Sequence, residues 1–596
     1  MKASKKQAVS VKGKKKPVVL AGKKKQTVAA SPKTNAKKKP IVSGGKKKQA
    51  VVARQKVNER KKQTVAASRK AVGKPAKEEA EFDFLKAPAP IPDSRISKTI
   101  STDVVVIGAA LSGLSAARAA LEAGASVAVI EKATDIVYRS SDIGVINSSI
   151  DKQIGNIVDP AEIVTVIQDY YHGRTSGELW RYWAENSGAA LDWWLELIPG
   201  YKLIDESFII PSETKEVYVR VPHWPHPKPY DPAREHYKIY STAHQLMPDM
   251  GNALRAVYNK CVAIGGKFAF STWARQLIRP GNKGRVTGVI AQNKAGKYIK
   301  YIAKKGVVLC TGDYAGDHKM VEKFCPDVAD LYVDWIFPNK DANGVTTHTG
   351  DGQKMGMWIG AQMERGPHAP VNHNLGGPLG TDSFLLVNVR GERFMNEDND
   401  GQIFTNAIER QPKNQAFQIF DAGWKEQLEC QGISHGMRTS VSPEVSHILG
   451  GGWGSNTTEE DVLSAAKKSD TLEGLAKELG LPVAPFLATV KRYNELAHAG
   501  KDTDFYKRAD RLFPIETPPF YGGPTSSALL VVMGGLVVNA RCNVCDAKFE
   551  PIPGLYAAGN AMGGRFAADY GLAAAGVSHG SALTFGRLAG QEAAKG

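Results

Sequence analysis

A chain of 596 residues exceeds what one hydrophobic core usually organises, so we expect two domains with additional segments. Hydrophobic residues make up 42% of the chain and glycine occupies 59 positions, which favours a large α/β protein over a fibrous or disordered one. The net charge of +18 arises in the first 80 residues, where 26 Lys and Arg face three Glu. The rest of the chain therefore carries −5, which argues against a basic groove for nucleic acid in the folded part.

The N-terminal tail repeats a Lys-rich theme, KKKP or KKKQ followed by Val and Ala, through residues 1–80. Such a segment buries too little apolar surface to offset its ordering entropy, so we expect it to be disordered. Two interpretations are open: a tether that contacts nucleic acid or an anionic surface, or a solubilising extension. With the Pro-rich stretch at 87–92, residues 1–95 are assigned to tail and linker.

The six cysteines are too few and too scattered for a disulfide framework or an iron–sulfur cluster. Cys542 and Cys545 form a CxxC motif, which we interpret as a turn sequence because no second pair completes a zinc site; a redox or metal role is the alternative. No apolar run of about 18 residues and no secretion signal is present. We therefore expect no metal, no transmembrane segment, and a reducing, cytoplasmic environment.

The first strong element in chain order is a strand–turn–helix–strand unit. Residues 101–108 have the pattern of a buried strand that runs into a glycine turn, residues 114–122 that of an Ala-rich helix, and residues 126–130 that of a second buried strand. This order predicts a dinucleotide-binding unit, with a purely structural βαβ turn as the alternative.

Four residues of this unit have predicted roles in binding a dinucleotide. Gly108 permits the tight turn, and Gly113 lets the helix pack on the strand. Ala110 stands where a middle glycine is usual; it is small enough for the backbone to approach a pyrophosphate at the helix N-terminus, although it crowds the phosphate slightly. Glu131 ends the second strand, where a carboxylate accepts hydrogen bonds from ribose hydroxyls.

Six further motifs follow in order along the chain, at residues 307–312 (VVLCTG), 349–352 (TGDG), 391–397 (GERFMNE), 533–535 (MGG), 554–560 (GLYAAGN) and 582–590 (ALTFGRLAG). Together with the glycine turn they resemble the flavoproteins related to fumarate reductase, succinate dehydrogenase, urocanate reductase and 3-ketosteroid Δ1-dehydrogenase. The resemblance covers roughly residues 101–596.

This resemblance implies an α/β fold, a Rossmann-like FAD-binding domain with an inserted α+β capping domain, and non-covalently bound FAD. A helix expected at 576–589 would direct its N-terminal amides at the flavin, where they stabilise negative charge on the reduced ring. In a strand at 272–278, the backbone of Ala274 would meet the adenine. The residues expected to contact the cofactor are Gly108, Ala110, Ser112, Gly113, Glu131, Lys132, Ala274, Asp351, Asn560, Ser578 and Leu583.

The resemblance also divides the chain. Residues 101–366 and 525–596 would form the FAD-binding domain and residues 367–524 the cap, which excludes water and positions substrate. Within the cap we expect helices at 459–479 and 483–499. Residues 200–245, rich in Trp, His, Pro and Tyr, are interpreted as an irregular insertion over the site or as a packed surface loop.

The substrate-binding residues of fumarate reductases are missing from their usual places. Those enzymes carry two arginines and a histidine where this chain has Gly401, the stretch 571–575 and Val531. Because paired arginines bind carboxylates bidentately, we expect a neutral or singly charged substrate rather than a dicarboxylate.

Three residues are the preferred catalytic candidates: Tyr570, Arg410 and His579. Tyr570 lies close to the place of a tyrosine of the 3-ketosteroid dehydrogenases and could donate a hydrogen bond to a developing enolate; a packed tyrosine is the alternative. His579, at the start of the last helix, would contact flavin or substrate or cap the helix. Further candidates for proton donation are Lys425, His368 and His373.

The expected activity is FAD-dependent oxidation or reduction of a CH–CH bond next to a carbonyl, with hydride exchanged at flavin N5 and an unknown electron donor or acceptor. Two alternatives are open. One is a flavin-dependent oxidase of another bond type, and the other is a flavin-binding interaction module tethered by the tail.

Overall fold

The computed structural model describes residues 82–596 except 206–207, 209, 212–213, 215, 224–237, 332–338, 377, 380–382, 400, 429–462, 465 and 572. The Lys-rich tail and Cys430 thus lie outside the described residues. The prediction that the tail is disordered stays a prediction.

The large sheet has eight strands and is built on a parallel core. In it, β1 lies between β2 and β10, with Val105 opposite Ala128 on one side and Val307 on the other. All three strands end in continuous buried Val, Ile, Leu or Ala residues, as expected for parallel strands covered on both faces. The strands are β16 (Asn543–Cys545), β17 (Pro551–Ala557), β10 (Tyr298–Leu309), β1 (Ile96–Ile107), β2 (Val127–Ile130), β7 (Lys267–Ala269), β8 (Thr272–Ile278) and β9 (Gly288–Asn293).

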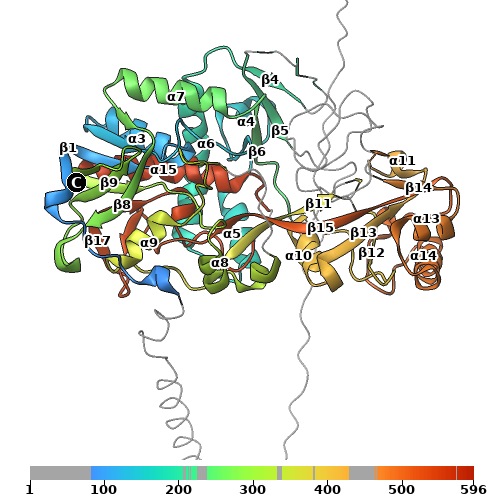
Figure 1. The fold of residues 1–596 in the computed structure, drawn as a ribbon. Coiled ribbons are helices and arrows are strands. Elements are labelled where there is room, and N and C mark those ends of the chain that lie inside the picture. The colour runs from blue at the N-terminus through green and yellow to red at the C-terminus, as the bar shows by residue number, and fades with distance from the viewer. Residues whose placement is uncertain are drawn as a thin grey trace, which may run out of the picture. The chain divides into compact units, whose positions relative to one another are not determined.

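Two helices, α3 (Leu111–Glu122) and α15 (Val577–Lys595), pack closely against one another beside this sheet (Figure 1). A Cβ atom at Gly586 or Gly590 would lie 2.5 Å or 2.2 Å from a backbone oxygen of α3, so the close approach requires glycine at both places. The predicted strand–helix–strand unit and the strand at 272–278 are confirmed, and the predicted last helix extends beyond residue 589 to Lys595.

A smaller sheet has four strands: β3 (Asp142–Gly144), β6 (Ala243–Met247), β5 (Tyr218–His223) and β4 (Lys202–Ile204). The interpretation of residues 200–245 as irregular is therefore wrong for its described parts, where three of these strands form. Other helices of this part of the chain are α4 (Ser149–Ile154), α5 (Pro160–Tyr170), α6 (Gly177–Leu195), α7 (Gly251–Ala263), α8 (His318–Phe324) and α9 (Asp351–Trp358).

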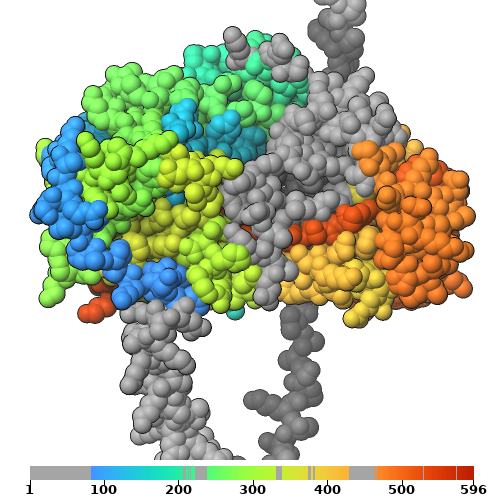
Figure 2. All heavy atoms as spheres, viewed as in Figure 1, coloured from blue at the N-terminus to red at the C-terminus, as the bar shows by residue number. Residues whose placement is uncertain are grey.

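The predicted cap contains an antiparallel five-stranded sheet with its own hydrophobic cluster, which includes Leu385, Ile419 and Phe486. In Figure 2 the orange residues of its later elements gather together, apart from the blue and green residues of the large sheet. Its elements are β11 (Ala369–Gly376), β12 (Leu385–Asn388), β13 (Gln415–Phe420), β14 (Lys467–Ser469), β15 (Phe520–Met533), α10 (Gly401–Glu409), α11 (Trp424–Leu428), α13 (Leu472–Leu479) and α14 (Val483–His498).

The predicted helix at 459–479 is wrong in its middle. Residues 467–469 pair with β15 as β14, and α13 begins only after Thr471, whose hydroxyl accepts a hydrogen bond from the Gly474 amide. The N-cap and the long-range strand pairing override local helix propensity here. The predicted helix at 483–499 is confirmed as α14.

The strands β11 and β15 join the cap to the rest of the chain. They pair antiparallel from Ala369 opposite Met533 to Gly376 opposite Thr525, with a register shift after Val371. The predicted boundary at residue 524 thus lies within β15. The two connections between the cap and the rest of the chain thus run side by side.

Residues 82–95, assigned above to tail and linker, lie against the large-sheet part. Phe84 is buried and its carbonyl accepts a hydrogen bond from the Trp358 indole at 2.8 Å. The Gln276 side-chain amide donates to Ala89 O at 2.8 Å, and its oxygen accepts from Ile91 N at 2.9 Å. The described part of the linker is therefore hydrogen-bonded to the large-sheet part at several residues.

The GERFMNE motif forms a buried ion network in the cap. The Arg393 guanidinium donates to both oxygens of Glu397, at 2.9 Å each, and to Asp502 at 2.8 Å. The rings of Tyr493 and Phe505 lie 5.0 Å and 4.9 Å from the guanidinium carbon. The motif thus ties β12 and its turn to the chain beyond α14.

The stability of the cap should depend on pH through Asp502. Burial would raise the pKa of this carboxyl, but hydrogen bonds from Arg393 and the amides of Phe505 and Lys507 lower it to about 2. A lowered folded-state pKa stabilises the fold above the ordinary value of 3.8, and this stabilisation, about 2 kcal/mol, is lost as the pH falls from there towards 2. In urea unfolding, Asp502→Asn should be less stable than the wild type at pH 7, and the difference should shrink below pH 4. A pH-independent difference would contradict this.

Candidate functional site

Two adjoining cavities lie at the carboxyl ends of the parallel strands, which is where open α/β sheets bind ligands. Their empty volumes are about 600 Å³ and 1160 Å³. Both are lined by Ala110, Cys310 and Gly312, so they meet at the turns that follow β1 and β10. We call the smaller one the inner cavity and the larger one the outer cavity.

Charged side chains of the inner cavity are paired. Glu131 accepts hydrogen bonds from the amides of Ala109 at 2.7 Å and Ala133 at 2.8 Å, and burial raises its pKa. The Lys132 ammonium lies 2.8 Å from the Asp351 carboxylate. Burial would raise the pKa of Asp351, but Lys132 holds it below its ordinary value. Both carboxylates thus line the inner cavity, and the hydrogen bonds and the ion pair fix their positions.

The outer cavity lies at the N-terminus of α15. Ser578 and His579 from the first turn of this helix line it, and no side chain caps the helix. The Tyr570 hydroxyl accepts a hydrogen bond from Ser578 N at 3.4 Å, and burial raises the pKa of this phenol. His579 Nδ1 lies 2.9 Å from Asp142 O, and burial lowers its pKa to about 4. At neutral pH the phenol is therefore protonated and the imidazole neutral.

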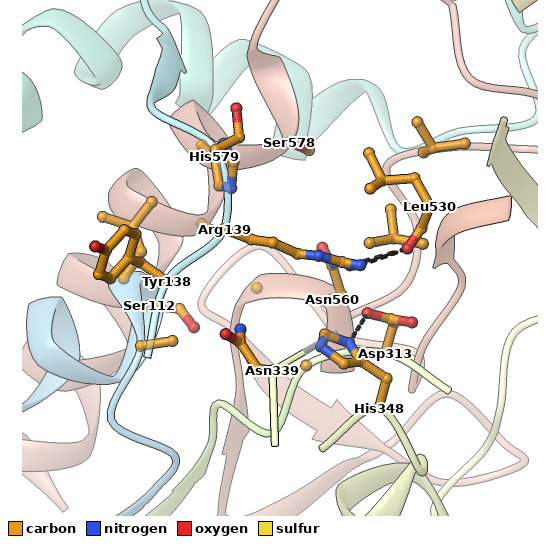
Figure 3. Close-up of a pocket in the computed structure, with 18 of the residues that line it drawn as sticks. Ser112, Tyr138, Arg139, Asp313, Asn339, His348, Leu530, Asn560, Ser578 and His579 are labelled. Carbon is orange, nitrogen blue, oxygen red and sulfur yellow. Dashed lines mark hydrogen bonds and ion pairs between the residues drawn. The ribbon is translucent and has the colours of Figure 1, made fainter. Parts of the chain in front are cut away.

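Three titratable side chains, Arg139, Asp313 and His348, lie together in the same cavity. Asp313 accepts a hydrogen bond from His348 at 2.7 Å, and Arg139 extends between this pair and His579 toward Leu530 (Figure 3). Burial would raise the pKa of Asp313, but His348 and Arg139 lower it. The cavity thus contains a carboxylate–imidazole pair and a buried guanidinium.

The sequence matches the model of one protein family, the FAD binding domain, over residues 103–577. The chain belongs to this FAD binding domain family. A curated relative, the vinyl phenol reductase of Lactiplantibacillus plantarum, is 26% identical over 84% of this chain and 98% of its own length. A probable fumarate reductase of Shewanella frigidimarina is 30% identical, but the match covers only 52% of this chain and 47% of that protein.

The solved structure of the 3-ketosteroid-Δ4-(5α)-dehydrogenase from Rhodococcus jostii has the same fold, with a TM-score of 0.63 and 22% identity over 86% of this chain and 99% of the other. The predicted fold class and family are therefore confirmed. As a member of the family, the protein is an FAD-dependent oxidoreductase that acts on CH–CH bonds.

The residues present fit FAD. The N-terminus of α3 faces both cavities and carries no side-chain cap, which leaves its first amides for a phosphate. Thr311 Oγ1 is buried in the inner cavity and has no hydrogen-bond partner in the described part of the chain. A polar ligand in the inner cavity would supply this missing partner.

The structure brings most of the predicted cofactor residues together. Gly108, Glu131, Lys132, Ala274 and Asp351 line the inner cavity, and Ala110 lines both. Ser112, Asn560 and Ser578 line the outer one. Gly113 and Leu583 line neither: Gly113 packs α3 against the Gly108 carbonyl, and Leu583 is buried in the main core.

Two of the three predicted catalytic residues, Tyr570 and His579, line the outer cavity. Arg410 follows α10, is exposed, and donates to Asn406 O at 3.1 Å, outside the lining. Lys425 lies on α11 with its ammonium 5.8 Å from the Trp424 ring centre, also outside the lining. The His373 side chain lies outside the described part.

Of the other residues named from the sequence, Val531 lines the outer cavity and His368 does not. His368 is buried against Phe324, its ring hydrogen-bonds to the Tyr314 hydroxyl at 2.5 Å, and burial lowers its pKa to about 4; it does not line the outer cavity. Val531 lines that cavity, whereas Gly401 and Ala573 do not.

Sequence reasoning missed several side chains of the outer cavity, among them Tyr138, Arg139, Asp142, Asp313, Asn339 and His348. Asp313 directly follows the TG of one motif and His348 precedes the next, so titratable residues beside the motifs were a usable signal. Arg139 stands in a loop without periodicity, and no local pattern distinguishes it.

Among the residues that the structure describes, no helix is long and apolar enough to cross a membrane. In the same part of the chain no group of His, Cys, Asp and Glu could hold a metal ion. The five described cysteines are free and buried.

Proposed function

We propose that the protein oxidises or reduces a carbon–carbon bond conjugated to a carbonyl group, on a substrate with at most one negative charge. Bound FAD supplies hydride exchange at N5, and a proton moves to or from the neighbouring carbon, so that two electrons and two hydrogens are exchanged in total. A cytoplasmic location stays a prediction.

The observation that carries the proposal is the shared lining of the outer cavity. Tyr570, the α15 N-terminus and Val531 line the same space, and a protonated phenol in it can donate a hydrogen bond to the oxygen of a developing enolate. We assign the ribose to Glu131, the pyrophosphate to the α3 N-terminus and the flavin to the α15 N-terminus.

A panel of acceptors tests this function. The FAD-loaded protein, photoreduced under anaerobic conditions, is mixed with a steroid enone, an aryl acrylate or fumarate, and reoxidation of the flavin is followed by absorbance. We expect the enone or the acrylate to reoxidise the flavin faster than fumarate does. If fumarate is the fastest acceptor, the proposed substrate class is wrong.

Tyr570→Phe should slow turnover by ~10- to 1,000-fold, because it removes the hydrogen bond to the developing enolate and leaves the ring packing in place. The flavin absorbance spectrum should not change. Tyr171→Phe is the matched control: this neighbouring phenol is also buried, and it contacts Gly571 N at 3.0 Å without lining the outer cavity. Full activity of Tyr570→Phe would remove Tyr570 from the mechanism.

A further inference from the structure

We propose that Asn406, on the cap helix α10, is a positioning residue for the reaction and that it acts through Asp569 on the phenol of Tyr570. The contact between the cap and the rest of the chain is then a condition for turnover, because it holds the proton-donating group in place. This inference rests on the proposed function and adds a residue that supports the same site. Neither Asn406 nor Asp569 belongs to one of the ordered motifs of the sequence.

A hydrogen bond joins the cap to the residue before Tyr570. The Asn406 side-chain amide donates to Asp569 Oδ2 at 2.8 Å. The other oxygen of this carboxylate, Oδ1, accepts a hydrogen bond from Tyr570 N at 2.9 Å. The Tyr570 hydroxyl in turn accepts from Ser578 N at 3.4 Å and lines the outer cavity. One carboxylate therefore connects a cap helix to the backbone of the residue whose phenol lines the cavity.

A second hydrogen bond fixes the orientation of the Asn406 side chain. Its Oδ1 atom accepts from the side-chain amide of Gln402, one turn earlier in α10, at 2.8 Å. An amide whose oxygen is used in this way presents its NH₂ group in the other direction, which here is toward Asp569. Asn406 and Asp569 are both partly buried, so water competes less for this hydrogen bond than it does at an exposed surface.

The helix that carries Asn406 is fixed to the two strands that connect the cap to the rest of the chain. The Glu409 carboxylate, at the end of α10, accepts hydrogen bonds from the Ser527 hydroxyl at 2.6 Å and from the Asn372 side-chain amide. Asn372 belongs to β11 and Ser527 to β15. The strand pair therefore sets the place of α10, and with it the place of the amide that Asp569 accepts from.

The charges around Asp569 make the loss of this amide costly. Burial raises the pKa of the Asp569 carboxyl; Asn406 and Arg410 lower it, and Asp327 raises it. Burial likewise raises the pKa of the nearby Glu409 to about 7, and Asp569 adds to this rise. Without the Asn406 amide, a partly buried carboxylate would lose a donor in acidic surroundings. We therefore expect the segment of Asp569 and Tyr570 to lose its fixed position.

The test compares Asn406→Ala in two backgrounds, with the full chain loaded with FAD. Alanine removes the amide and is a better helix former than asparagine, so α10 should stay folded. In the wild-type background, kcat for the fastest acceptor of the panel should fall by ~10- to 100-fold, as expected for the loss of a hydrogen bond to a charged group. In the Tyr570→Phe background it should change by less than about 3-fold, because the phenol through which Asn406 acts is already absent.

Two further variants serve as rescue and control. The double variant Asn406→Asp with Asp569→Asn exchanges donor and acceptor: the amide at position 569 can donate to the carboxylate at position 406 and still accept from Tyr570 N. It should recover most of the activity that Asn406→Ala loses. Asn186→Ala is the matched control, because this partly buried amide lies on α6 and donates within its own helix, to Tyr182 O at 2.9 Å. It should keep full activity.

An exchange measurement separates this inference from the proposed function. Hydrogen–deuterium exchange of the peptide that contains Tyr570 is followed by mass spectrometry in the FAD-loaded chain. The Tyr570 amide should exchange at least ~10-fold faster in Asn406→Ala than in the wild type, whether or not an acceptor is turned over. If the wild type reduces no acceptor, the proposed function fails and the exchange rate still decides whether Asn406 positions Tyr570. An unchanged exchange rate, or an equal loss of kcat in both backgrounds, would overturn the inference.

Discussion

Gly108→Val is expected to abolish FAD binding, so that the purified variant is colourless where the wild type is yellow. Gly108 has a φ of +107°, and a Cβ atom there would lie 2.2 Å from the carbonyl oxygen of Cys310. A β-branched side chain is strained at this φ, and it would displace the Cys310 backbone, which lines the inner cavity together with Gly108. Flavin absorbance per mole of protein and a titration with added FAD measure the loss.

Two further variants make this result interpretable. Gly124→Val places the same side chain at a φ of +82° with no atom within 4 Å, so it carries the backbone strain without the collision and should keep FAD. Ala110→Leu leaves the backbone unstrained, since φ is −93°, and fills the junction of the two cavities; it should also lose FAD. A folded Ala110→Leu protein with unchanged FAD affinity would contradict the location of the site.

Arg393→Met is expected to destabilise the protein by about 3–5 kcal/mol, because it leaves the carboxylates of Glu397 and Asp502 buried without their shared cation. Both carboxylate side chains are fully buried, so water cannot replace the lost guanidinium. Glu397 keeps the Lys507 ammonium at 3.5 Å, so we expect the loss to fall mainly on Asp502. The measurement is urea unfolding at pH 7, followed by tryptophan fluorescence, with the midpoint as the readout.

The matched control for Arg393 is Arg492→Met. Arg492 pairs with Asp504 at 2.7 Å, but its side chain is half exposed, and surface pairs of this kind contribute about 0–1 kcal/mol. The two variants remove the same group and differ in its burial. Similar losses in both would mean that the GERFMNE motif has another role than holding the cap together.

The order and spacing of residues predicted the cofactor-binding half of the protein well. The unit β1–α3–β2 is continuous in the chain. Its hydrophobic run, glycine turn and terminal acid lie close together in sequence, at the spacing of a dinucleotide-binding unit. The prediction of FAD and of the fold class is confirmed. The cap was harder to predict, because β14 forms only by pairing with β15, about 50 residues further along the chain.

Local periodicity and contiguous motifs were enough to predict the strand–turn–helix–strand unit and the long closing helix. The FAD-binding fold was predicted from the resemblance of the ordered motifs to known flavoproteins. The lining of the outer cavity could not be predicted in either way. Arg139 and Leu530 are 391 residues apart, and they meet because one stands in a loop and the other at a bulge, neither of which has a repeating pattern. Long-range packing, and not local propensity, therefore decides which side chains line the outer cavity.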